Sequence, residues 1–133
     1  MVFLSALIEA YVHLEMYGEA LALIAETQAE EERTGDGHFT AELHRLKGAC
    51  LLALSPSGAD EAEACFEQAL NISRKQHAKS LELRAATSMA QLWLQQGKQA
   101  DARRLLQNIY GWFTEGFDTR DLLEARRVLD TLH

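Results

Sequence analysis

Apolar residues recur at three- and four-residue steps along most of the chain, the spacing that brings side chains onto one face of an α-helix. The first such stripe holds Leu4, Leu7, Ile8, Tyr11 and Leu14. Later stretches follow the same spacing, and none shows the strict alternation typical of a half-buried strand. The pattern therefore predicts an all-α protein of seven helices, near residues 2–15, 18–33, 39–54, 59–77, 80–95, 99–114 and 119–132.

A short motif repeats within this pattern: a small residue, three spacers and then a large apolar residue. It occurs as Ala20 with Ile24, Ala62 with Phe66, and Ala102 with Leu106. The small residues are 42 and 40 residues apart, a period typical of stacked helix pairs. We therefore expect one domain over residues 1–133, a right-handed solenoid of antiparallel helix pairs. The pairs are predicted at about 2–33, 39–77 and 80–114, followed by a C-terminal capping helix at 119–132.

Residues that end or begin helices fall between these predicted elements. Gly35 separates the first pair from the second, and Pro56 breaks the second pair internally because a proline cannot continue a helix. Gly97 marks the turn inside the third pair, whereas the corresponding glycine of the first pair is displaced to Gly18. Thr119 is the predicted N-cap of the last helix.

The third pair, Met89-Ala-Gln-Leu-Trp93-Leu-Gln-Gln-Gly97-Lys-Gln-Ala-Asp-Ala102, resembles a tetratricopeptide repeat with Trp93 in the aromatic position of its first helix. Four segments carry a wider resemblance, in this order: Ala41-Glu-Leu-His-Arg-Leu-Lys-Gly48, Glu61-Ala-Glu-Ala-Cys-Phe-Glu-Gln-Ala-Leu70, Lys79-Ser-Leu-Glu-Leu-Arg-Ala-Ala86 and Tyr110-Gly-Trp-Phe-Thr-Glu-Gly-Phe-Asp-Thr119. The chain is similar to the C-terminal repeat region of large bacterial signalling proteins. Those proteins join a class III adenylate/guanylate cyclase domain, or a transcriptional-regulator DNA-binding domain, to a predicted ATPase domain and then to tetratricopeptide-like repeats. The resemblance implies a regulatory scaffold rather than an enzyme.

Polar residues on the first helix of each pair predict a binding groove, because these helices line the concave side of helix-pair solenoids. Long polar side chains there can hold a peptide backbone or a carboxylate. Counting from the buried stripes gives the groove residues Glu9, His13, His44, Arg45, Arg84, Ser88, Gln91 and Gln95. Two interpretations stay open at this point: a groove for a protein or peptide partner, or a solvated helix face without a ligand.

The first predicted helix is apolar almost all round, whereas a terminal repeat needs a polar outer face. We expect its residues Phe3, Leu4, Leu7 and Ile8 to be covered. The cover is either an upstream repeat or a second copy of the chain in a homodimer.

Aromatic residues are concentrated late in the chain, at Tyr110, Trp112, Phe113 and Phe117. They either seat the last helix over the preceding pair or form an exposed anchor for a partner. The spacing favours the first interpretation, because Tyr110 and Phe113 share a helical face with Leu106.

The formal net charge of −7 argues against a protein that binds nucleic acid directly, since phosphate contacts need clustered Lys and Arg. Residues 1–69 hold 3 Lys and Arg against 13 Asp and Glu, whereas residues 70–133 hold 10 against 7. This asymmetry reflects either differing solvated faces or a field that orients a partner. No stretch is long enough to span a membrane, and Cys50 and Cys65 have the pattern of small buried residues. We expect a cytoplasmic protein that contacts no membrane.

No motif for a phosphate loop, a zinc protease or a calcium loop occurs in the sequence. The histidines and cysteines lack the paired spacing of a zinc site, and a nucleophilic pair of Cys50 with His44 lacks a third orienting group. We therefore expect no cofactor, no metal and no catalytic residue. The predicted function is a non-catalytic scaffold module of a bacterial signalling or transcriptional regulator, which binds a protein or peptide partner through the groove. The alternative is a small-molecule sensor with its ligand in the same groove.

Overall fold

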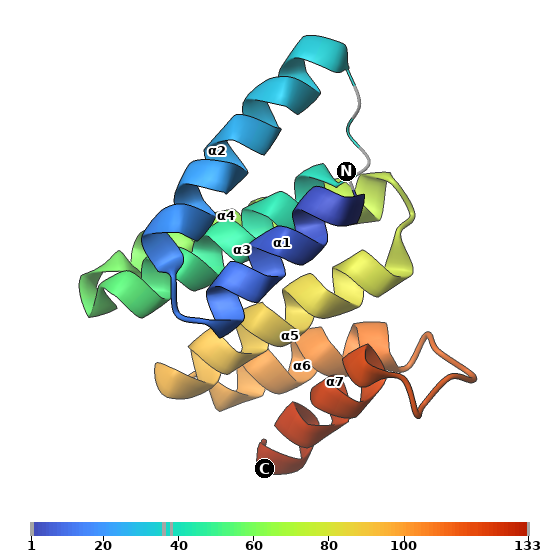
Figure 1. The fold of residues 1–133 in the computed structure, drawn as a ribbon. Helices are drawn as coiled ribbons and strands as arrows, with labels where there is room; N and C mark the ends of the chain where they lie inside the picture. Colours follow the sequence, from blue (N-terminus) through green and yellow to red (C-terminus); the bar gives the residue numbers. More distant parts are fainter. Residues whose placement is uncertain (1, 36, 38, 133) are drawn as a thin grey trace. The chain divides into compact units, whose positions relative to one another are not determined.

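A computed structural model of the chain describes residues 2–35, 37 and 39–132, without the side chains of Val2, Phe3, Ser5 and Pro56. Seven α-helices and one short 3-10 helix occur in these ranges, and no strand does (Figure 1). The helices are α1 (Val2–His13), α2 (Tyr17–Thr34), α3 (Thr40–Leu54), η1 (Pro56–Gly58), α4 (Ala59–Lys75), α5 (Lys79–Gln95), α6 (Gln99–Tyr110) and α7 (Arg120–Thr131). The all-α class is therefore confirmed. The stacking of these helices as a solenoid stays a prediction.

The chain divides into two compact units, residues 1–69 and residues 70–133, and the division falls within α4. It coincides with the change of charge seen in the sequence, since the acidic excess belongs to unit 1 and the basic excess to unit 2. Each unit is described by itself.

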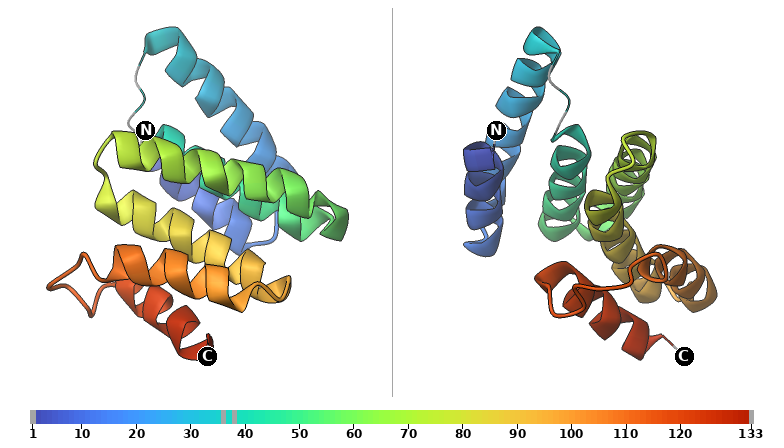
Figure 2. Two further views of the ribbon diagram at one scale, coloured as in Figure 1. Left: turned by 180° about the vertical axis from the view of Figure 1, so that it is seen from behind. Right: turned by 90° about the vertical axis from the view of Figure 1, so that its right-hand side faces the viewer.

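In unit 1, α1 packs against both α2 and α3, and α2 packs against α3. The core of this three-helix contact consists of Ile8, Ala20, Ile24, Leu43, Leu46 and Cys50. All six side chains are at most 2 % exposed. Of the first predicted stripe, Ile8 belongs to this core, whereas Leu4, Leu7 and Tyr11 are half-buried and Leu14 is exposed. The α1–α2 hairpin is seen from two further sides in Figure 2.

The repeated motif occupies the same place in each second helix. Ala20, Ala62 and Ala102 are each the fourth residue of their helix, in α2, α4 and α6, and each is 0 % exposed. The residues four and seven places later are buried as well: Ile24 and Thr27, Phe66 and Ala69, Leu106 and Ile109. The three helices therefore begin in the same phase relative to their buried faces, as the sequence spacing predicts.

Three of the connecting turns share one backbone geometry, in which a residue in the left-handed region ends the helix. That residue is Glu15 after α1 (φ 60°), His77 after α4 (φ 54°) and Gly97 after α5 (φ 80°). In each turn the N–H of the next residue bonds back to a helix carbonyl: Met16 to Tyr11 at 2.8 Å, Ala78 to Ser73 at 2.9 Å and Lys98 to Trp93 at 2.8 Å. The expectation that Gly18 serves the first turn is wrong. Gly18 lies inside α2, and Glu15 takes the strained conformation.

In unit 2, α5 packs along α6, and α7 contacts both of them (Figure 2). Ala86 and Ala90 of α5 are fully buried, as close helix packing requires. The predicted helix 99–114 is four residues too long, because α6 ends at Tyr110 with Gly111 as its C-cap. Residues 111–119 form a non-helical loop, and Thr119 is the N-cap of α7 as predicted, although its side chain makes no capping bond.

Candidate functional site

The predicted groove residues of unit 1 include a cross-helix ion pair. Arg45 of α3 lies 3.7 Å from the carboxylate of Glu9 on α1 and also donates a hydrogen bond to Glu42 within α3. Glu42 is only 3 % exposed, so its charge depends on Arg45 for compensation. The arginine thereby links the two first helices of this unit and balances two carboxylates.

His44 and Arg45 do not share a face, although the sequence argument placed them together. Neighbouring residues on a helix point about 100° apart, because the helix has 3.6 residues per turn. Arg45 points towards α1, whereas His44 lines a cleft between α2 and α3. Burial, and secondarily the positive charge of Lys47, lowers the pKa of His44 below its ordinary value. The neutral form of His44 is therefore favoured, and its side chain lies on a different surface from that of Arg45.

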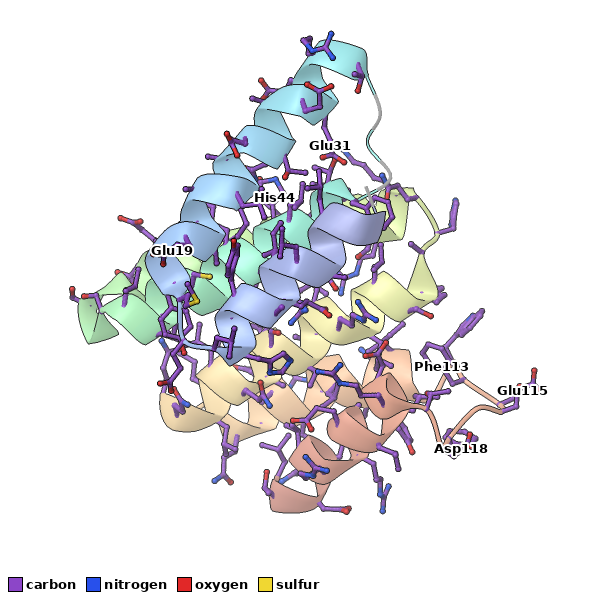
Figure 3. All side chains as sticks on the ribbon, in the orientation of Figure 1. Glu19, Glu31, His44, Phe113, Glu115 and Asp118 are labelled. Carbon is purple, nitrogen blue, oxygen red and sulfur yellow. The ribbon has the colours of Figure 1, made fainter. Side chains whose placement is uncertain are left out.

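The cleft that holds His44 has a volume of about 330 Å³. Its walls come from the C-terminal half of α2, the connection after it and the first turns of α3: Gln28, Glu31, Glu32, Gly35, Gly37, Thr40, His44 and Lys47. Figure 3 shows Glu31 and His44 on these two helices. Polar groups of both signs line it, so it can accommodate a small polar molecule.

Glu31 also has a structural task at this cleft. Its carboxylate accepts a hydrogen bond from the backbone N–H of Phe39 at 3.3 Å and another from the Thr40 hydroxyl at 2.8 Å. Phe39 is the N-cap of α3 and has no side-chain cap of its own. Glu31 therefore supplies from α2 the anionic group that the start of α3 needs.

The groove residues of unit 2 are engaged by α7. Arg84 of α5 bonds to Asp121 of α7 at 2.8 Å, and Gln91 of α5 bonds to Glu124 of α7 at 3.1 Å. Ser88, between them on α5, is half-buried. Two side-chain hydrogen bonds thus join one face of α5 to α7, just as Arg45 joins α3 to α1 in unit 1.

The remaining groove residues, His13 and Gln95, are exposed near the ends of α1 and α5. Three partners of the groove residues, namely Glu42, Asp121 and Glu124, were not predicted from the sequence. A signal for the last two was present, because they are three residues apart and share one face of α7.

The residues expected to be covered by a neighbour divide into three cases. Ile8 is 0 % exposed and belongs to the unit 1 core, so including it in an outward surface was wrong. Leu4 and Leu7 are half-buried, which leaves part of each at the surface. The side chain of Phe3 lies outside the described part of the structure. At the end of α1, Leu14 is 68 % exposed.

The cysteines do not have the environment of activated nucleophiles. Burial raises the pKa of Cys50 to about 11, and burial is also the main cause that raises the pKa of Cys65. Both thiols therefore stay protonated at neutral pH. Among the described residues, no group of three or more His, Cys, Asp or Glu side chains is arranged to hold a metal. In the same part of the chain, no helix combines the length and apolarity needed to cross a bilayer.

Comparisons of the chain with known protein families, with curated proteins and with solved structures find no match. The polar links described above and the surfaces around them are therefore what indicates a function.

Proposed function

We propose that this chain is a non-catalytic interaction module of the helix-repeat type, which binds a protein or peptide partner through the polar faces of α1, α3, α5 and α7. The observation that carries the proposal is the recurrence of one arrangement in two separate units. In each unit, an arginine on the first helix of a pair is joined to a carboxylate on a neighbouring helix: Arg45 of α3 with Glu9 of α1, and Arg84 of α5 with Asp121 of α7. We place the module in a bacterial signalling or transcriptional regulator, on the sequence resemblance alone.

Each of these polar faces, taken by itself, suits the binding of an extended peptide. Arginine and carboxylate pairs at helix junctions offer charged donors and acceptors in fixed positions, because each group is already held by its neighbour. The exposed amides of Gln91 and Gln95 lie one turn apart on α5 and can bond to a peptide backbone. A partner that forms hydrogen bonds with these groups is therefore oriented without the entropy loss of ordering flexible side chains.

The test compares partner capture by the unchanged protein and by two variants. In the face variant, Gln91→Ala is combined with Gln95→Ala. In the matched control, the exposed amides Gln107 and Asn108 of α6 are both replaced by alanine. Partner capture is measured by cross-linking. We expect the unchanged protein and the control to be cross-linked to a specific partner, and the face variant to lose that partner. Equal loss or equal retention by the two variants argues against this face.

A second candidate function, small-molecule sensing, is favoured by one observation, the cleft of about 330 Å³ lined by His44, Thr40 and Lys47. A ligand that binds only the folded chain raises the melting temperature by mass action. The test is a thermal-shift screen of polar metabolites, repeated with Lys47→Ala. A shift that disappears in Lys47→Ala supports the sensor, and the absence of any shift across the screen argues against it.

A further inference from the structure

The loop between α6 and α7, residues 111–119, exposes two large aromatic side chains. Trp112 is 57 % exposed and Phe117 is 43 % exposed. Both rings are nevertheless held by neighbours: Trp112 lies edge-on to Phe113 at 5.1 Å between ring centroids, and Phe117 lies tilted against Tyr110 at 5.7 Å. The exposed rings are therefore presented in fixed positions, which lowers the entropy lost when a partner binds.

Two carboxylates lie on the same loop. Glu115 and Asp118 are both exposed, and within the described residues neither side chain has an ion-pair or hydrogen-bond partner. Figure 3 shows Glu115 at the outer end of the loop, with Phe113 and Asp118 closer to the helices. The acidic pair stands out because residues 70–133 as a whole carry an excess of positive charge.

The protein itself shows how such a surface holds a cation. The ammonium group of Lys79 lies 5.6 Å from the centroid of the Trp112 ring and 3.5 Å from a carboxylate oxygen of Glu82. A ring face and a carboxylate thus bind one cationic side chain together. The same loop exposes the Phe117 ring, the part of the Trp112 ring that Lys79 leaves open, and two carboxylates. The described residues supply no cation to Phe117, Glu115 or Asp118.

We propose that residues 111–119 form a docking site for a basic segment of a partner protein, whose Arg or Lys side chains contact Trp112 or Phe117 and pair with Glu115 and Asp118. Arginine suits the site well, because its planar guanidinium stacks on aromatic rings and bonds to carboxylates at the same time. The site adds a second surface to the interaction module proposed above. It does not depend on the polar faces of the helices.

The probe is a short peptide of alternating Gly and Arg, and its control is the same peptide with Gln in place of Arg. Binding is measured by titration calorimetry at low and at physiological salt. We expect the Arg peptide to bind and the Gln peptide not to bind. Trp112→Ala should weaken binding about tenfold or more, as expected for a central aromatic contact. Glu115→Gln combined with Asp118→Asn should weaken it about fivefold at low salt and flatten its salt dependence.

A charge-matched control separates docking from general attraction, since unit 1 is strongly acidic. Glu19→Gln combined with Glu26→Gln removes two exposed carboxylates of α2 and should leave binding nearly unchanged. An equal loss in this control overturns the proposal, as does equal binding of the Gln peptide. If circular dichroism shows that Trp112→Ala does not fold, two other variants decide the question: Trp112→Phe, and Glu115→Gln combined with Asp118→Asn. Trp112→Phe should then still bind the Arg peptide, and the variant without the two carboxylates should still bind it more weakly.

This outcome is independent of the first proposal. Gln91→Ala combined with Gln95→Ala should not change binding of the Arg peptide, because both amides lie on α5 rather than on the loop. Loss of the cross-linked partner in that variant, with peptide binding intact, supports both surfaces. Peptide binding that falls with the α5 variant contradicts the loop proposal alone.

Discussion

Replacing Gly48 with alanine tests how closely α3 and α4 approach each other in unit 1. A Cβ atom at Gly48 would lie 2.7 Å from Cε1 and 3.0 Å from Cδ1 of the Phe66 ring, and 3.1 Å from the carbonyl oxygen of Ala62. The Phe66 side chain is only 2 % exposed, so its ring has little room to move away. The Ala62 carbonyl oxygen belongs to the backbone of α4 and cannot yield without shifting that helix. The added methyl group is therefore too close both to the Phe66 ring and to the α4 backbone.

The size of the effect follows from two opposing contributions. Inserting a methyl group into a packed core costs about 1–3 kcal/mol. Alanine regains about 1 kcal/mol relative to glycine inside a helix. All three contacts are shorter than ordinary van der Waals distances, which favours the upper part of the first range. We expect Gly48→Ala to lower the free energy of unfolding by about 1–2 kcal/mol.

The measurement is urea denaturation followed by circular dichroism, with Gly18→Ala as the matched control. Gly18 is also helical, but an added Cβ there meets no atom within 4 Å. Gly18→Ala should therefore leave stability unchanged or raise it by about 0.5 kcal/mol. Phe66→Leu removes the ring atom nearest to the new methyl group. The double variant should accordingly show a favourable coupling of about 1 kcal/mol between the two sites.

The packing argument would be refuted by a Gly48→Ala protein that is as stable as the unchanged one. Strictly additive effects of Gly48→Ala and Phe66→Leu would place the cost elsewhere than in the ring contact.

Three further predictions concern turns, a half-buried histidine and a cross-helix cap. Glu15→Gly and His77→Gly should each raise the free energy of unfolding by about 0.5–1 kcal/mol in urea denaturation, because both residues have positive φ. Gly97→Ala should lower it by about 1 kcal/mol for the same reason. A loss of stability in both Glu15→Gly and His77→Gly contradicts the turn assignment. The pKa of His44 is lowered in the folded chain from its ordinary value of 6.5, so the stability linked to its neutral form is present above that pH and is lost as pH falls through the folded pKa. The His44→Gln protein should therefore lose less stability than the unchanged protein between about pH 7 and about pH 5. Parallel profiles of unfolding free energy against pH for the two proteins would exclude this role. Glu31→Ala should lower the free energy of unfolding by about 1–3 kcal/mol, because the start of α3 loses two hydrogen bonds. Glu26→Ala, on the exposed face of α2, should change it little. Equal effects of the two substitutions would show that the loss of the cap is not the cause.

The helices and their buried faces could be predicted from the sequence because they depend on local spacing. Ala20, Ala62 and Ala102 lie at equivalent fourth positions of their helices because their spacers and flanking breaks set the phase before any packing occurs. The end of α6 could not be predicted in this way. The apolar spacing continues to Phe113, yet the chain turns after Tyr110, whose ring contacts Phe117 from beyond the turn. That contact joins residues separated by a loop, so it leaves no periodic signal.

By itself, the sequence determined the all-α class, the number of helices and much of the buried face of the later helices, because a helical stripe is a property of consecutive residues. Only the tertiary structure decided which neighbours the polar residues have. It put Arg45 against Glu9 and His44 in the cleft, buried Ile8 completely, and joined Arg84 and Gln91 to α7. The physical reason is that the surroundings of an outward side chain depend on which helix packs beside it, and that choice is made by apolar contacts between segments far apart in the chain.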